Sequence, residues 1–211
     1  HRRQRQMCIR DSFQAMVRLV VQPGGSLETF AALEHAVEAG HWLHLQAMQA
    51  GGRTADEDLS VPACDWPHEG GVVLASGGSQ GGRSLCLQPF THLDRSAAAC
   101  GRWLEGIGLS PGGLMLLNPL PVHHISGLMP WWRARLWGAQ HVPLPPPLMK
   151  DPPSLRATCR DLPGWGQKPV VVSLVPTQLK RLLDHPEGMA WLQLLAVVWV
   201  GGAGLPEPLA A

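Results

Sequence analysis

The chain has 211 residues, of which 45% are hydrophobic and 16% charged, so it is long and apolar enough for one domain or one and a half with a sizeable core. Its 17 basic and 16 acidic residues give a net charge of +1, which provides no electrostatic reason to expect nucleic acid or an anionic membrane as a partner. No apolar run reaches the roughly 18 residues of a membrane span, so we expect no stable membrane insertion. The five cysteines form no C-x-x-C pair, which is typical of reduced thiols in a cytoplasmic protein.

Both ends of the chain look unlike a natural domain. Residues 1–12 are basic and without periodicity, and Met7–Asp11 resembles the translation of a sequencing adapter, so we predict that this segment is not native. The chain stops at Ala211, directly after a predicted strand and turn, where an α/β protein normally continues. We therefore expect a fragment.

An N-terminal helical or α/β segment is predicted over residues 13–50. Ser26 has the character of a helix cap, and Phe30, Leu33 and Val37 then recur at helical spacing before Gly40. Residues 41–45 are ambiguous between strand and helix. Residues 51–70 are rich in Gly, Asp, Glu and Pro and are predicted to be a linker.

From residue 71 onward, predicted strands alternate with predicted helices. The strands are 72–75, 85–87, 114–117, 140–144, 170–175 and 194–200, and the helices are 91–106 with Thr91 as cap, 128–137, 154–160 and one starting at Pro176. The prolines at 145–147 and 152–153 argue against regular structure there. This alternation predicts an α/β fold with a mostly parallel sheet flanked by helices.

A glycine-rich loop, Ser76–Ser84, joins the first two of these strands. Small hydroxyl and glycine residues let backbone N–H groups surround an anion, which favours a nucleotide-phosphate loop. As a Walker A motif it would have Arg83 for the usual lysine and would need a helix from that residue, whereas Leu85-Cys86-Leu87 is typical of a strand. A P-loop NTPase is thus the alternative, and an ordinary flexible turn is the simplest explanation.

Between two strands, this loop resembles the phosphate loop of the adenylate-forming superfamily, the acyl- and aryl-CoA ligases. Ser76-Gly77-Gly78-Ser79-Gln80-Gly81 follows the first six positions of that motif, and Arg83-Ser84 stands where the family has Pro-Lys. Three later segments also resemble the family, in the same order and spacing: Leu120–Leu128, Val175–Leu179 and Val200–Pro206. Within the superfamily, the His-x-Ser-Gly and Pro-Thr-Gln-Leu runs are most similar to the 2-succinylbenzoate–CoA ligases of menaquinone and phylloquinone biosynthesis.

The resemblance implies that residues 71–211 are an incomplete AMP-binding domain, part of the large N-terminal domain of the ligase fold. It implies an ATP-dependent enzyme that adenylates a carboxylate, with 2-succinylbenzoate as the expected acid, and then transfers the acyl group to coenzyme A, with Mg²⁺ bridging phosphate oxygens. The segments that carry the family's ribose-binding Asp and catalytic Lys would lie past Ala211, so we expect no ligase activity from this chain alone. A non-catalytic nucleotide-binding module is a further alternative, and a homo-oligomer of the full-length parent stays open.

The resemblance also assigns roles to individual residues. His124 would flank the reacting carboxylate, with Ser126 and Thr177 as further substrate contacts. The cofactor-binding residues would be Ser76, Gly77, Gly78, Ser79, Gln80, Gly81, Arg83, Gly201, Gly202 and Ala203, and no residue is expected to ligate a metal.

Each of these residues also has a simpler explanation. His124 fits a packed loop histidine, Ser126 a turn residue and Thr177 a helix start. Arg133 and Arg135 are expected to be solvated surface arginines, with contact to a second substrate carboxylate as the alternative. The Trp131, Trp132 and Trp137 cluster is more typical of core than of a ligand platform.

Overall fold

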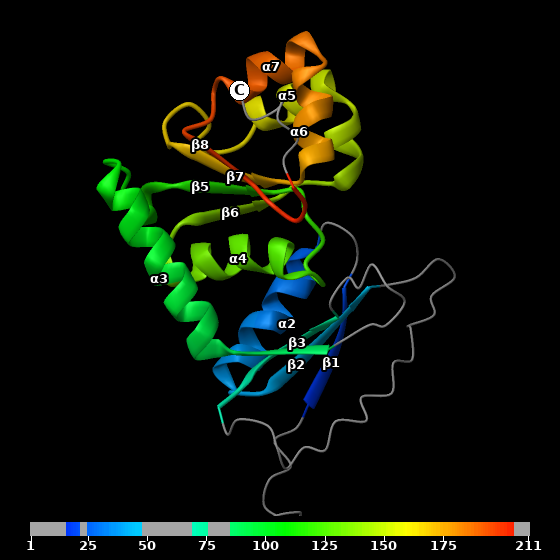
Figure 1. Ribbon diagram of the computed structural model, residues 1–211, viewed down its shortest axis with the longest axis vertical. Helices are drawn as coiled ribbons and strands as arrows, with labels where there is room; N and C mark the ends of the chain where they lie inside the picture. The colour runs from blue at the N-terminus through cyan, green and yellow to red at the C-terminus, as the bar shows by residue number, and fades with distance from the viewer. Residues whose placement is uncertain (1–15, 22–24, 48–68, 76–84, 205–211) are drawn as a thin grey trace, which may run out of the picture. The chain divides into compact units, whose positions relative to one another are not determined.

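The computed structural model describes residues 16–21, 25–47, 69–75 and 85–204 (Figure 1). The predictions for residues 1–12, for most of the linker 51–70 and for the glycine loop 76–84 lie outside the described residues. Two compact units divide the chain: apart from residues 23–25, one runs up to Leu93 and the other begins at Asp94. Each unit contains one four-stranded sheet.

The first sheet has the strand order β1-β2-β3-β4, in which β1 to β3 are parallel and β4 runs antiparallel to β3. Ser26 caps α2 as predicted, because its Oγ accepts a hydrogen bond of 3.1 Å from the backbone N–H of Thr29. The ambiguous segment around His44 is a buried strand. The elements are β1 (Met16–Val21), α2 (Leu27–Glu38), β2 (Trp42–Ala47), β3 (Gly71–Ala75) and β4 (Leu85–Pro89).

The two strands beside the glycine loop form an antiparallel hairpin. Ala75 pairs with Leu85 at one end of the ladder, and Gly71 pairs with Pro89 at the other. The chain therefore leaves the loop as a strand, and no helix starts at Leu85. A P-loop NTPase needs a helix at this point, so the Walker A alternative is wrong.

The second sheet is entirely parallel, with the strand order β6-β5-β7-β8. Its strands are joined by helical crossovers, as parallel pairing requires. The helices are α3 (Phe90–Gly106), α4 (Ile125–Trp137), α5 (Pro152–Arg160), α6 (Pro176–Leu183) and α7 (Pro186–Leu192), and the strands are β5 (Met115–Asn118), β6 (Gln140–Pro143), β7 (Val170–Leu174) and β8 (Val197–Val200). Short 3-10 turns occupy Pro111–Gly113 and Pro146–Lys150.

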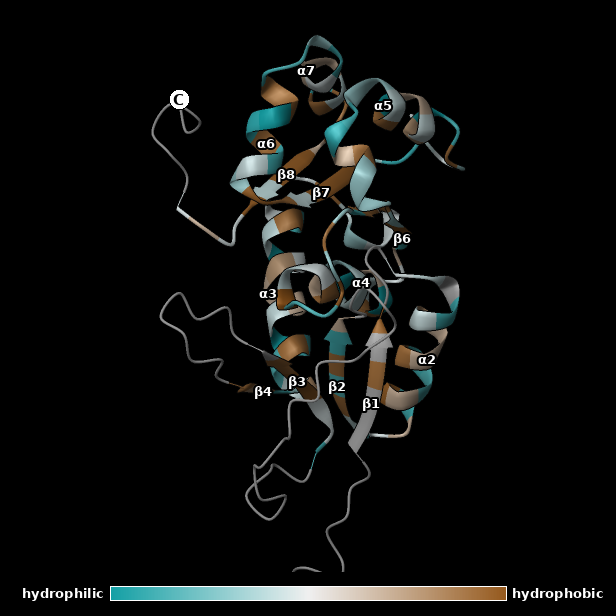
Figure 2. Ribbon diagram, turned by 90° about the vertical axis from the view of Figure 1, so that its right-hand side faces the viewer, coloured by the Kyte–Doolittle hydropathy of each residue, from teal (hydrophilic) through white to brown (hydrophobic). Residues whose placement is uncertain are grey.

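Side chains alternate between the two faces of this sheet, and each face has its own apolar cluster. Figure 1 shows α5, α6 and α7 on one side and α4 on the other. Met115 and Leu117 pack on the first side with Leu155 and Trp191, whereas Leu116 packs on the second. Figure 2 shows β7 and β8 as largely hydrophobic, which is typical of parallel strands covered on both faces.

The structure changes several predicted boundaries. α3 begins at Phe90, so Thr91 is not its cap; its hydroxyl instead donates to the carboxylate of Glu69. The proline cluster is not irregular: it contains the 3-10 turn at Pro146–Lys150 and the first turn of α5, where prolines need no N–H partner. The sequence prediction missed α7 altogether.

Among the described residues, no helix is both long enough and apolar enough to cross a membrane.

Candidate functional site

A pocket of about 290 Å³ lies in the second unit, at the carboxyl ends of its parallel strands. This edge is where ligands generally bind in parallel α/β sheets. The volume lies just below the roughly 300–1,000 Å³ that is typical of small-molecule sites. The lining residues are Cys100, Leu120, Ile125, Ser126, Met129, Arg133, Ser173, Leu174, Trp199, Val200, Gly201 and Gly202.

Two elements supply most of this lining. Ser126, Met129 and Arg133 follow one another at helical spacing on α4, so they share one face of that helix. The ends of β7 and β8 supply the opposite wall, because Ser173 pairs with Trp199 and Leu174 with Val200 across the ladder. The pocket is thus mostly apolar, with a few polar groups placed along it.

Arg133 is the charged residue among those that line the pocket. Its guanidinium carbon lies 4.6 Å from the centre of the Trp199 ring, a cation–π arrangement. Its Nε atom is buried and, among the described residues, has no hydrogen-bond partner. Burial lowers the pKa of Arg133, and the neighbouring Cys100 thiol opposes that shift. Arg133 is therefore not a solvated surface arginine, and the pocket holds a largely desolvated positive charge with spare donor capacity.

Arg135, two residues along the same helix, has a different setting. Its guanidinium carbon lies 5.8 Å from the ring centre of Trp132, and it does not line the pocket. Trp131 and Trp132 are buried, as predicted for core residues. The two arginines of α4 thus provide a matched pair, one in the pocket and one outside it.

The loop before α4 places two histidines side by side. The ring centres of His123 and His124 are 4.2 Å apart. Burial, together with the charge of His124, lowers the pKa of His123 to about 4, and partial desolvation of the more exposed His124 ring lowers its pKa as well. Both rings are therefore mainly neutral at pH 7.

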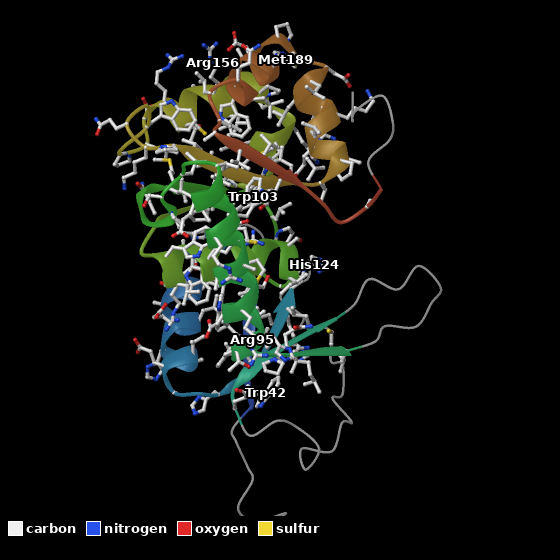
Figure 3. All side chains as sticks on the ribbon, turned by 60° about the vertical axis from the view of Figure 1, so that its left-hand side comes forward. Trp42, Arg95, Trp103, His124, Arg156 and Met189 are labelled. Atoms are coloured by element: carbon white, nitrogen blue, oxygen red, sulfur yellow. The ribbon has the colours of Figure 1, made fainter. Side chains whose placement is uncertain are left out.

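The structure brings together only part of the predicted site. Ser126, Gly201 and Gly202 line the pocket. His124 is the exposed N-cap residue of α4, next to the lining residue Ile125, and Figure 3 shows it at the beginning of that helix. Ala203 and Thr177 are exposed and do not line the pocket. The loop residues Ser76, Gly77, Gly78, Ser79, Gln80, Gly81 and Arg83 lie outside the described residues.

Sequence reasoning missed Trp199 and Cys100 and treated Arg133 as surface. The helical spacing of Ser126, Met129 and Arg133 was visible in the sequence and could have placed Arg133 on the binding face. Trp199 gave no such signal, because its position next to Arg133 depends on how β8 pairs with β7.

Within the described ranges, no group of three or more His, Cys, Asp or Glu side chains is placed to hold a metal ion. A metal at this site would need other ligands, such as phosphate oxygens of a bound nucleotide.

Comparison of the sequence with models of protein families and with curated proteins finds no match. Comparison of the structure with solved structures does find matches. An o-succinylbenzoate CoA synthetase from Bacillus subtilis, bound to a product analogue, matches with a TM-score of 0.60 at 15% identity, over 92% of this chain and 45% of that one. The same synthetase in complex with the acyl-adenylate intermediate matches with a TM-score of 0.57 at 16% identity, over 92% and 57%.

A malonyl-CoA ligase with methylmalonyl-CoA and AMP bound also matches, with a TM-score of 0.57 at 15% identity, over 97% of this chain and 49% of that one. The chain thus spans about half the length of the structures that it matches. These likenesses confirm the predicted fold, a mixed α/β arrangement like part of the adenylate-forming acyl-CoA ligases.

Proposed function

We propose that this chain is the acid-binding part of an AMP-forming acid–CoA ligase whose substrate is 2-succinylbenzoate, an intermediate of menaquinone and phylloquinone biosynthesis. The fold and the similarity of four sequence segments support the class of reaction. One observation supports the acid: a half-buried arginine whose Nε atom is buried and unpartnered, in a small apolar pocket.

2-Succinylbenzoate has an aromatic ring, a ketone and two carboxylates. One carboxylate reacts, and the other must be accommodated in the site without its water. Arg133 offers a charged, planar donor set for that second carboxylate, and charge-assisted hydrogen bonds of this kind are among the strongest in proteins. Leu120, Met129 and Leu174 offer apolar contacts for the ring.

The reaction has two steps. An oxygen of the reacting carboxylate attacks the α-phosphorus of ATP, forming an acyl–phosphate bond while pyrophosphate leaves; the thiolate of coenzyme A then attacks the acyl carbon, and AMP leaves. We propose that Ser126 and His124 orient the reacting carboxylate at the beginning of α4, with Thr177 as a further contact. Gly201, Gly202 and Ala203 would present backbone to the nucleotide, because glycine lets a ligand approach closely.

Bound ATP and Mg²⁺ would supply the leaving group and neutralise its charge. The described residues contain no carboxylate cluster for the metal, so its ligands are proposed to be phosphate oxygens. The residues from Ser76 to Gly81 are proposed to hold these phosphates through backbone N–H groups and hydroxyls, with Arg83 as a further contact. The enzyme is proposed to be cytoplasmic.

The second candidate function is a non-catalytic nucleotide-binding module of the same fold, because Arg83-Ser84 stands where the family's loop has Pro-Lys.

The first test measures binding of the acid to the 211-residue chain. Tryptophan fluorescence reports this binding, because Trp199 lines the pocket. We expect 2-succinylbenzoate to bind more tightly than 4-oxo-4-phenylbutanoate, which lacks the ring carboxylate. Arg133→Met should weaken binding of the dicarboxylate by roughly 10- to 100-fold, since a charged hydrogen-bond partner is lost. The monocarboxylate should lose less than about threefold.

Arg135→Met is the matched control, because it removes the same charge from the same helix outside the pocket. Its affinity for both acids should stay at the wild-type level. Equal losses for both acids in Arg133→Met, or equal effects of the two substitutions, would remove the support for 2-succinylbenzoate.

The second test separates a ligase from a binding module. Release of pyrophosphate from ATP in the presence of 2-succinylbenzoate, by the natural protein that contains this chain, would support the ligase. Binding of the acid and ATP without release of pyrophosphate would support the binding module instead.

A further inference from the structure

Asn118, the last residue of β5, has a buried side-chain amide that is hydrogen-bonded to two backbone groups and one histidine ring. Only 1% of its surface is exposed. Its Oδ1 accepts from the backbone N–H of Leu120 at 3.2 Å, and its Nδ2 donates to the carbonyl oxygen of Gly127 at 2.7 Å. The other Nδ2 hydrogen is directed to Nε2 of His141, at 3.1 Å.

These partners fix which way the amide points. Leu120 offers only a donor and Gly127 only an acceptor, so the oxygen must face Leu120 and the nitrogen must face Gly127. The Nδ2 group has no lone pair to offer, so Nε2 of His141 acts as acceptor and that ring is neutral. An asparagine amide can accept from the N–H of Leu120 and donate to both Gly127 and His141. An aspartate carboxylate in the same place could only accept from Leu120.

The three contacts reach three separate parts of the second unit. Leu120 lies in the loop after β5, Gly127 lies in the first turn of α4, and His141 belongs to β6. The loop and the helix are also in direct contact: a methyl group added at Gly127 would overlap the carbonyl groups of Pro121 and Leu120. The N–H of His124 closes the loop by donating to the carbonyl of Pro121 at 3.1 Å.

The pocket depends on this junction. Leu120 lines the pocket from the loop, and Ile125 and Ser126 line it from the first residues of α4. Asn118 is hydrogen-bonded to both segments, to the loop at Leu120 and to α4 at Gly127. Asn118 itself does not line the pocket. A change in the separation of Leu120 and Gly127 would therefore move lining residues without removing any of them.

We propose that Asn118 is a positioning residue of the binding site: its amide holds the first turn of α4 against the loop after β5 and thereby places Leu120, Ile125 and Ser126 at the pocket. The consequence for substrate rests on the proposed function, because the ligand is the acid proposed above. The hydrogen bonds themselves do not depend on which acid binds.

The test uses Asn118→Asp and Asn118→Ala in the 211-residue chain, with affinity for 2-succinylbenzoate as the first measurement. Both variants lose the donor to Gly127, so both should bind the acid roughly tenfold more weakly, since the net contribution of a buried hydrogen bond is about 1 kcal/mol. Leu155→Ala is the control for stability alone: it empties a core site on the other face of the sheet, lowers the melting temperature by several degrees and should leave the affinity unchanged.

A pH series adds a measurement that a purely structural role would not change. Lowering the pH protonates the buried carboxyl of the Asn118→Asp variant and restores a donor toward Gly127. Relative to wild type at the same pH, Asn118→Asp should therefore recover part of its affinity between pH 7 and pH 5.5, whereas Asn118→Ala should not. His141 is in contact with this position, and a carboxylate at residue 118 would raise its pKa from the value of about 4 that burial gives it beside the Asn118 amide. The pH series is therefore run in the His141→Gln background, where no imidazole at residue 141 can take up the proton.

Amide hydrogen exchange tests the role of Asn118 independently of the proposed function. In Asn118→Ala, exchange at the N–H groups of Leu120, Gly127 and Leu128 should accelerate, and in Asn118→Asp the N–H of Leu120 should stay protected because its acceptor remains. If the wild-type chain fails to bind 2-succinylbenzoate, the proposed function fails while these exchange rates still test Asn118. Unchanged exchange in Asn118→Ala, or an affinity loss in Leu155→Ala equal to that of the Asn118 variants, would overturn the role of Asn118.

Discussion

The two faces of the sheet β6-β5-β7-β8 are built from alternate residues of the same strands, yet they differ in how they are covered. On one face, Met115, Leu117, Val170, Val172 and Leu174 pack with apolar side chains of α5, α6 and α7. On the other, Leu116 and Val171 pack with α3 and α4, but the cover is incomplete at the strand ends, where the pocket holds Arg133 and Ser173. One face stabilises the unit, and the other combines stabilisation with the candidate binding pocket.

This difference teaches where polar groups are tolerated. On the covered face a polar side chain would lose its water without gaining a partner, at a cost of about 1–3 kcal/mol. At the pocket the same group keeps space and access to a ligand. Four predictions can break or sharpen the comparison, and they are given in order of decreasing upper bound on the stability change.

Trp191→Ala tests the covered face most severely. Trp191 on α7 is fully buried in the cluster of that face, so its removal should lower the free energy of unfolding by about 3–5 kcal/mol. Urea denaturation of the purified chain measures this change. At temperatures where the variant is folded, its affinity for 2-succinylbenzoate should equal that of wild type, and a selective loss of affinity would show that the two faces are not independent.

Acid pH should destabilise the unit through His141. Burial lowers the pKa of His141 to about 4, below the 6.5 of an exposed histidine, so the unfolded chain takes up the proton first as the pH falls. The free energy of unfolding is therefore unaffected by this group above pH 6.5 and falls by up to about 3 kcal/mol as the pH approaches 4. Denaturation curves at several pH values measure the slope.

His141→Gln is the matched variant for this prediction. A glutamine oxygen can still accept from Asn118, but it does not titrate, so stability at pH 7 should be retained and the slope between pH 6.5 and pH 4 should become shallower. His123, whose pKa is also lowered to about 4, would leave a residual slope of the same sign. An unchanged slope in His141→Gln would contradict the assignment to His141.

Two neighbouring residues of β7 provide the most direct comparison of the faces. Val172 points into the covered cluster, and Ser173 lines the pocket. Val172→Ser should cost about 2–3 kcal/mol of unfolding free energy, because it buries a hydroxyl and removes apolar contact. Ser173→Val should change stability by less than about 1 kcal/mol and act instead on affinity for the acid; similar stability costs for both would erase the distinction.

Gly127→Ala should lower the free energy of unfolding by about 1–3 kcal/mol, because the added methyl group meets backbone carbonyls that cannot move aside freely. Thermal melting measures it. Gly113→Ala is the control, since nothing lies within 4 Å of a methyl group there and its φ is not positive. If the two alanine variants melt together, the contact between the loop and α4 is looser than the structure describes.

Much of the fold could be predicted from local signals. Val170–Leu174 reads as a buried strand because it is β-branched and apolar, and α2 was located by its cap at Ser26. The beginning of α4 was misplaced because nothing local distinguishes Ile125 from loop: that turn is stabilised by Asn118, seven residues upstream of it, and by the close approach of Pro121. Tertiary contacts decided that boundary.

The candidate site was predictable to a lesser degree. Ser126, Gly201 and Gly202 came from segments that resemble a known family, and the structure places them in one pocket. The environment of Arg133 could not be derived in the same way, since it depends on Trp199, which reaches it only through the pairing of β8 with β7. Charge alone suggested a surface residue, and burial by another element changed that conclusion.

The central position of β5 also has a kinetic consequence. β5 pairs with β6 on one side and with β7 on the other, both times in parallel, so each pairing must wait until a long crossover has been closed. Closing these loops costs conformational entropy before the strands form their hydrogen bonds and packing contacts, so such sheets form slowly. The helices should therefore appear early in refolding, while Asn118 reaches His141 only after β6 has paired with β5. The candidate pocket, which also needs Ser173 and Trp199 from the paired strands β7 and β8, should be completed last.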